Sequence, residues 1–248
     1  MWSEIVEYAY DNLTLSFIWI ERNGLLPSIR KNPPPLSSGK ILYYLLCSIL
    51  INAFGNSLTV SLNMGSSMWT AAAVNSSHFF AIPLSDAMLC FAFFAIFANI
   101  VMTKRIKWRM LLGNFVFMFP FSYLVRFFTD TLVAVGLPQL PFVIKLALDC
   151  IGILFIAIGV SIYQRVNVMI HPIDELMNNV RFLYCKGNAR IGMWVSFIPP
   201  ISVIVLLYVL SGQLYAVHLG TIVALLFQGT WIGMADKVVF PSLHHYFR

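Results

Sequence analysis

Charged side chains are scarce in this chain of 248 residues: only 10% are Asp, Glu, Lys or Arg, whereas 59% are hydrophobic. The mean hydropathy is +0.81. This balance excludes an ordinary soluble domain, in which about 25% of the residues are charged. A membrane β-barrel is disfavoured too, because barrel strands alternate polar and apolar residues and the apolar runs here are continuous.

Sequence motifs of enzymes are also lacking. The chain contains no HExxH, no GxSxG and no P-loop, the signatures of zinc proteases, α/β-hydrolases and nucleotide-binding proteins. The four cysteines are scattered, without CxxC or metal-ligand spacing, and we expect ordinary buried thiols at Cys47, Cys90, Cys150 and Cys185. The sequence therefore predicts a protein that is not an enzyme and that holds neither a metal nor another cofactor.

Apolar stretches of membrane-spanning length are what the chain does have, since a helix needs about 20 residues to cross the hydrocarbon core. Six such stretches occur, at Ile41–Leu62, about 84–103, about 110–129, about 141–163, Ile191–Ser211 and Leu214–Ala235. We predict an all-α membrane domain with six transmembrane helices over residues 41–248. Residues 1–40, which are mixed polar and aromatic and do not read as a signal peptide, are expected to form a cytoplasmic or interfacial extension.

The basic residues predict the orientation of these helices. Fourteen of the 16 Lys and Arg lie before the first span, in the two connections after the second and fourth spans, or after the sixth span. The other three connections, 64–83, 131–140 and 212–213, contain none. By the positive-inside rule, the basic face and both termini are cytoplasmic. The net charge of +6 is therefore attributed to topology and to contact with membrane lipids, not to nucleic acid.

Two segments of the chain resemble each other. AFGNSLTVSLNMGSSMWTAAAVN (53–75) aligns without a gap to AIGVSIYQRVNVMIHPIDELMNN (157–179), with identities that include Gly55 over Gly159 and Asn63 over Asn167. LLGNFVFMFPFS (111–122) likewise resembles HLGTIVALLFQG (218–229). Because three spans separate equivalent points, we predict two inverted three-helix repeats, 41–130 and 141–237, as in many secondary transporters. The alternative is that the shared small residues only permit close helix packing.

The same stretches resemble a known family. G-x-S-L-T-V…N-M-G-S-S-M-W-T-A, G-V-S-I-Y…V-M-I-H-P-I-D-E-L-M and L-G-T-I-V-A-L-L-F-Q-G are similar to motifs of the YczE/YyaS/YitT group of bacterial membrane proteins, over about residues 41–236. This chain departs from the group at Met169 and at Ser67–Met68, where Gly and Pro are usual. The resemblance implies a multi-pass protein of the bacterial plasma membrane, often described as a transporter or permease, without an established substrate.

Ionisable residues within the predicted spans are candidate functional groups, because they are costly in hydrocarbon. Asp149 lies about two turns from the outer end of the fourth span, with Lys145 one turn away, and Arg126 lies near the outer end of the third span. We expect Asp149 to face the inside of the bundle and to cluster with both bases. The cluster would be either a structural ion pair or a site for a coupling ion or an anion.

Asp174 and Glu175 follow Pro172, which suits the first turn of a helix, so they are expected to cap that helix or to form a cytoplasmic gate. Residues expected to bind a substrate are Ser57, Asn63, Trp69, Arg126, Asp149, Asn167, Asp174 and Gln228. The predicted function is secondary transport of a small polar or amphiphilic solute. The alternative is an accessory protein that binds another membrane protein, and a homo-oligomer is possible in either case.

Overall fold

The computed structural model describes residues 36–104, 106, 108–185 and 189–243. The predicted extension therefore lies outside the described residues, apart from its last five. The described residues form eight α-helices and a 3-10 turn: α2 (Ser38–Leu62), α3 (Met68–Phe80), α4 (Leu84–Thr103), α5 (Trp108–Ala134), η1 (Leu137–Gln139), α6 (Phe142–Val166), α7 (Pro172–Leu183), α8 (Ala189–Ser211) and α9 (Leu219–Val238).

Six of these helices are long and apolar enough to cross a membrane, namely α2, α4, α5, α6, α8 and α9. They coincide with the six predicted spans, so a multi-pass membrane protein is compatible with the structure. The two largest differences are at the end of the third span, which extends to Ala134 and not to about 129, and at the start of the last span, which begins at Leu219 and not at Leu214. Residues 212–218 instead form a connection whose backbone bonds to side chains that precede α3 or belong to it.

Residues 64–83, predicted to be an outer connection, contain the helix α3. Its 13 residues are too few to cross a membrane, yet all residues from Trp69 to Ser76 are buried. The second short helix, α7, begins at Pro172 with Asp174 and Glu175 in its first turn, as the sequence had indicated. The described part of the chain thus contains one short helix after α2 and another after α6.

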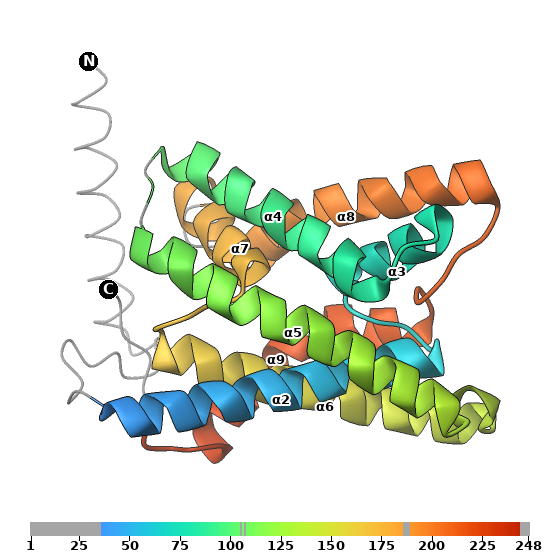
Figure 1. Cartoon of the computed structure of the whole chain (residues 1–248), viewed down its shortest axis with the longest axis horizontal. Coiled ribbons are helices and arrows are strands. Elements are labelled where there is room, and N and C mark those ends of the chain that lie inside the picture. Colours follow the sequence, from blue (N-terminus) through green and yellow to red (C-terminus); the bar gives the residue numbers. More distant parts are fainter. Residues whose placement is uncertain (1–35, 105, 107, 186–188, 244–248) are drawn as a thin grey trace.

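The long helices are arranged around these two short ones. In Figure 1, α2, α6 and α9 lie along one side of the molecule and α4 and α8 along the other, with α3 and α7 between them. Helix α2 packs on α5 and α6, and α6 packs in turn on α9. The two short helices, α3 and α7, each pack on the same two long helices, α4 and α8.

Close contact between α2 and α6 depends on glycine. A Cβ atom added to Gly55 would lie 2.6 Å from the backbone oxygen of Gly152, and one added to Gly159 would lie 2.6 Å from the Cβ of Asn52. Small residues allow helix backbones to approach closely, and the gain in van der Waals contact stabilises helix pairs in membranes. The contact between α2 and α6 brings together two helices that both line the site described next.

Candidate functional site

A cavity of about 170 Å³ lies in the interior of the helix bundle. Its wall is built by the first turns of both short helices together with α2, α4, α5, α6, α8 and α9. The polar and ionisable lining residues are Asn52, Asn56, Ser67, Thr70, Tyr163, His171, Asp174 and Gln228. The aromatic and methionine residues are Trp69, Met88, Phe91, Phe121, Met177, Met193 and Phe197. The cavity is therefore an apolar chamber with a small number of converging polar groups, as expected of a small-molecule site.

One side of the cavity carries a chain of hydrogen bonds between α2 and the start of α3. Asn52 and Asn56 are one turn apart on the same face of α2, and the Asn56 amide donates to Asn52 Oδ1 at 2.7 Å. Thr70 Oγ1 donates to Asn56 Oδ1 at 2.8 Å and lies 3.0 Å from Ser67 Oγ. Because these groups satisfy one another, the polar wall of the cavity is held in a fixed geometry.

The cavity wall also carries a carboxylate, that of Asp174 in the first turn of α7. The hydroxyl of Tyr163, from α6, donates a hydrogen bond to Asp174 Oδ2. Asp174 lies outside the six long helices, and burial raises the pKa of its carboxyl to about 6, an effect that the Tyr163 hydrogen bond opposes. At neutral pH the cavity therefore contains a carboxylate that is mostly ionised.

His171 precedes α7 and caps it, since its Nδ1 accepts a hydrogen bond from the backbone N–H of Ile173 at 3.3 Å. The imidazole ring packs edge-on against Phe117 and Phe121. Burial lowers the pKa of His171 to about 3, so the ring is neutral at physiological pH and adds no positive charge to the cavity.

Amide side chains attach the two short helices to their neighbours. On α7, Asn179 donates to Asn99 Oδ1 at 2.9 Å, and Asn99 donates to the carbonyl of Pro172 at 3.0 Å. Asn114 of α5 donates to Glu175 at 2.6 Å. On α3, Asn75 exchanges two hydrogen bonds with the backbone of Tyr215, at 2.7 and 3.0 Å. Both short helices are thus fixed by amide groups, not by apolar packing alone.

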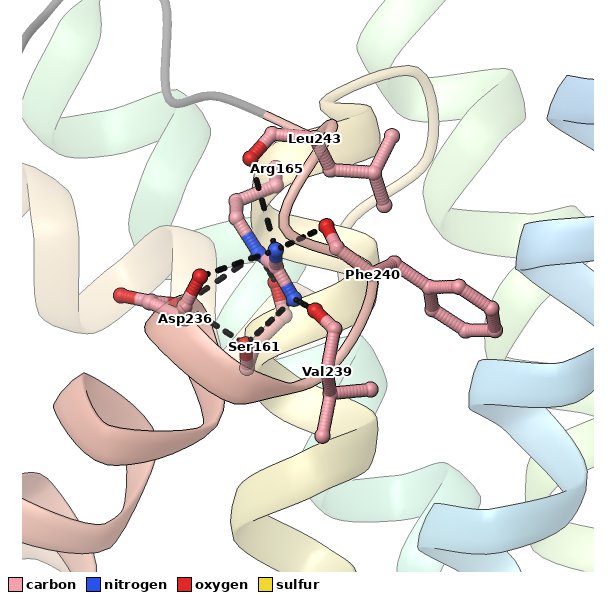
Figure 2. A network of polar contacts seen from close by, with 6 residues as sticks. All are labelled: Ser161, Arg165, Asp236, Val239, Phe240 and Leu243. Atoms are coloured by element: carbon pink, nitrogen blue, oxygen red, sulfur yellow. Dashed lines mark hydrogen bonds and ion pairs between the residues drawn. The ribbon is translucent and has the colours of Figure 1, made fainter.

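A second polar network lies at the C-terminal end of α6 (Figure 2), and none of its residues lines the cavity. Arg165 is only 1% exposed, and its guanidinium forms an ion pair with Asp236 at 3.3 Å and a hydrogen bond to Ser161 Oγ at 2.8 Å. It also donates to the carbonyls of Val239, Phe240 and Leu243. The side chain therefore fastens the end of α9 and the segment that follows it to α6, which is a structural role.

The predicted cluster around Asp149 is not formed. Asp149 is fully buried, as expected for a carboxyl inside the bundle, but neither of its oxygens has a hydrogen-bond partner among the described residues. Arg126 pairs instead with Asp130, one turn along the same exposed helix face, at 3.6 Å. Lys145 makes no ion pair with Asp149 within the described part of the chain. The physical reason is the rotation of α6, which points Asp149 toward Gly220 at the start of α9.

Three of the eight predicted substrate-binding residues line the cavity: Trp69, Asp174 and Gln228. Asn63 and Asn167 instead end α2 and α6, both in the left-handed conformation with φ of 49° and 48°. Asn63 Oδ1 also accepts a hydrogen bond from the N–H of Ala216 at 2.8 Å. Ser57 donates toward backbone carbonyls of α2 and α5. Arg126 and Asp149 lie outside the cavity lining.

Sequence reasoning missed most of the polar wall, namely Asn52, Asn56, Thr70 and Tyr163. A signal for two of them was present, because Asn52 and Asn56 are amides one turn apart in an apolar span, where polar groups need partners. No group of three His, Cys, Asp or Glu side chains suited to a metal ion occurs in the described ranges.

Comparison with known proteins gives one family. Neither the curated proteins nor the solved structures include a significant match to the chain. The DUF6198 family, which is described only as being of unknown function, matches residues 39–237. This is nearly the range of the resemblance to the YczE/YyaS/YitT group, but the description of the DUF6198 family does not name that group. Because the match covers all six long apolar helices, the chain belongs to the DUF6198 family.

Proposed function

We propose that this protein is a secondary transporter that binds a small amphiphilic solute in the central cavity. The observation that carries the proposal is the position of the cavity between the first turns of α3 and α7, two short helices that follow the long helices α2 and α6. Short helices whose N-termini converge on a central site are a recurrent feature of transporters built from repeats. A drug-sized site encloses roughly 300–1,000 Å³, so a cavity of about 170 Å³ suits a smaller solute.

The two inverted repeats remain part of this proposal, and three features support them. Each half of the membrane domain has the order long, short, long, long: α2 to α5 and α6 to α9. Asn63 and Asn167, which align in the sequence, end the first helix of each half in the same left-handed conformation. Much of the packing pattern is retained when the halves are exchanged, since α2–α5 then becomes α6–α9 and α3–α8 becomes α7–α4, although the contact of α4 with α5 has no counterpart of similar size between α8 and α9.

Alternating access requires the hydrogen bonds that hold the two sides of the bundle to open in turn. On the side predicted to be extracellular, Asn63 and Asn75 hold the connection before α9. On the predicted cytoplasmic side, Asn99 and Asn114 hold α7. Each hydrogen bond contributes only about 1 kcal/mol net, so either set can open while the α2–α6 contact stays intact. We place both termini in the cytoplasm and the protein in a bacterial plasma membrane, and we propose neither an enzymatic activity nor a cofactor.

The proposal can be tested without knowing the solute, by cysteine accessibility. Ser67 lines the cavity and Ser67→Cys is nearly isosteric, so it reports on the cavity once the four native cysteines are replaced by alanine. A membrane-impermeant thiol reagent should label this cysteine both on intact cells and on inside-out vesicles. Gln213→Cys, on the exposed connection before α9, should react only on cells, and Lys104→Cys, at the end of α4, only on vesicles.

The rival function, an accessory protein that binds another membrane protein, predicts a different result. A cavity that never opens to both sides would leave Ser67→Cys unlabelled, or labelled from one side only, while the two surface cysteines react normally. That outcome would overturn transport. If Gln213→Cys instead reacts only on vesicles and Lys104→Cys only on cells, the predicted orientation is wrong, but the transport proposal is unaffected.

A further inference from the structure

The charge of the cavity points to the class of solute, an inference that rests on the proposed function and deepens it. The lining includes one residue that is ionised at neutral pH, Asp174, and none of the lining residues in the described part of the chain is Lys or Arg. Among the described lining residues the basic side chain is that of His171, which is neutral because burial lowers its pKa to about 3. The wall therefore carries a net negative charge.

Helix dipoles do not reverse this sign. The N-terminus of a helix carries a partial charge of about +0.5, which attracts anions. On α7 the first turn contains a second acid, Glu175, which offsets this charge. Helix α3 has no acidic residue in its first turn, but about half a positive charge there is outweighed by a full negative charge on Asp174. An anionic solute would thus be repelled, and a cationic one attracted.

Aromatic rings complete a binding site for a cation. Five of them line the cavity, from five different helices: Trp69, Phe91, Phe121, Tyr163 and Phe197. Trp69 is held in place by Phe91 and Phe94, with ring centroids 6.0 and 6.3 Å away. The faces of aromatic rings attract organic cations, and the interaction is strongest where water is excluded, as in the aromatic cages that bind quaternary ammonium groups. An inorganic cation would gain less, because most of this wall offers no oxygen ligands.

We propose that the central cavity binds a small organic cation of the amine or quaternary ammonium class, with its charge near Asp174 and its apolar part against the aromatic rings. The Tyr163 hydroxyl, which donates to Oδ2 of the carboxylate, holds Asp174 in the cavity wall. Asn52 and Asn56 line the same space, and the hydrogen bonds that they make with each other and with Thr70 keep this part of the wall in place. This assigns Asp174 to binding in addition to its favourable position in the first turn of α7.

The test compares two probes of nearly the same shape, choline and its neutral isostere 3,3-dimethyl-1-butanol. Thermal unfolding of the purified full chain in detergent is measured at pH 7.5 against each probe, with sodium chloride added to match the ionic strength. Methylammonium and tetramethylammonium extend the series. We expect at least one of the three cations to stabilise the protein with an apparent Kd roughly 10-fold or more below that of the isostere.

Variants locate the effect. Asp174→Asn keeps an oxygen that can accept from Tyr163 but removes the charge, so the preference for the cation should disappear. Asp130→Asn, which neutralises an exposed acid remote from the cavity lining, is the matched control and should keep it. If Asp174→Asn does not yield folded protein, Trp69→Leu replaces it, because loss of the ring should weaken the binding of the cation and leave that of the isostere nearly unchanged.

The inference is wrong if the isostere binds as tightly as all three cations, or if the preference persists in Asp174→Asn. It fails separately from the proposed function. A cysteine at position 67 that is labelled from both sides, without any preference for a cation, would leave transport standing and overturn only the class of solute. Selective binding of a cation with labelling from one side only would support the site and overturn transport.

Discussion

Because α2 and α6 are in close contact at glycine, we expect replacement of these glycines by alanine to lower the free energy of unfolding. In Gly55→Ala, the new Cβ would lie 2.6 Å from the backbone oxygen of Gly152 and 2.8 Å from the backbone nitrogen of Ile156. Neither atom belongs to a flexible side chain, so the two helices must separate. Overpacking of this kind costs about 1–3 kcal/mol, whereas replacing glycine by alanine within a helix gains about 0.5–1 kcal/mol. The difference between these ranges is about 0–2.5 kcal/mol, and because both contacts are with backbone atoms the cost lies in its upper half, so the net loss in the free energy of unfolding is about 1–2 kcal/mol.

Gly159→Ala should cost about as much, because its Cβ would lie 2.6 Å from the Cβ of Asn52 and 2.9 Å from the backbone oxygen of Ser48. Gly55 and Gly159 are also equivalent positions of the proposed repeats, so similar losses are expected on that ground too. The matched control is Gly233→Ala in α9, where the new Cβ meets nothing within 4 Å. This variant should be as stable as the parent protein or more stable.

Thermal unfolding in detergent, followed by size-exclusion chromatography, measures the difference. A loss of 1 kcal/mol lowers the unfolding temperature by roughly 2–4 °C in a protein of this size. Gly55→Ala and Gly159→Ala should therefore unfold several degrees below Gly233→Ala. If all three variants unfold at the same temperature, the α2–α6 contact is not as close as described, and the reasoning is refuted.

Three further predictions concern the ionisable residues. Asp236→Asn removes the counter-charge of the Arg165 guanidinium, which is 1% exposed, and should lower the free energy of unfolding by about 3 kcal/mol. Asp130→Asn breaks the exposed pair with Arg126 and should lower it by less than about 0.5 kcal/mol. Equal losses in the two variants would contradict this ranking. The pKa of Asp174 is raised to about 6, so only about one-tenth of the carboxyl is ionised at pH 5. The affinity for choline should therefore be nearly constant above pH 7 and fall about 10-fold between pH 7 and pH 5. If thermal shift shows the same affinity over this range, Asp174 does not bind the cation. Asp149→Asn breaks no ion pair, so the unfolding temperature at pH 7 should not fall; a drop of several degrees would reveal a counter-charge that the structure does not show.

Much of the fold could be predicted from the sequence, because the bilayer constrains it strongly. Continuous apolar runs of about 20 residues have few alternatives to spanning helices, and all six predicted spans contain a long apolar helix. The start of α7 was predictable for a local reason. Proline followed by two acids suits a first turn, and Pro172, Asp174 and Glu175 occupy that turn.

The composition of the candidate site was decided by tertiary structure. Spanning helices that are apolar on nearly all sides do not reveal which face is turned inward, so the sequence could not tell that α6 directs Tyr163 to the cavity and Asp149 toward Gly220. Helix α3 is too short to be recognised as a span. Its burial depends on contacts with the next helix, α4, and with α8, which is distant in sequence. This packing brings Trp69 into the same cavity wall as the first turn of α7. The sequence by itself determined that the chain forms six apolar helices with polar residues among them; the rotation and packing of those helices decided which polar residues meet.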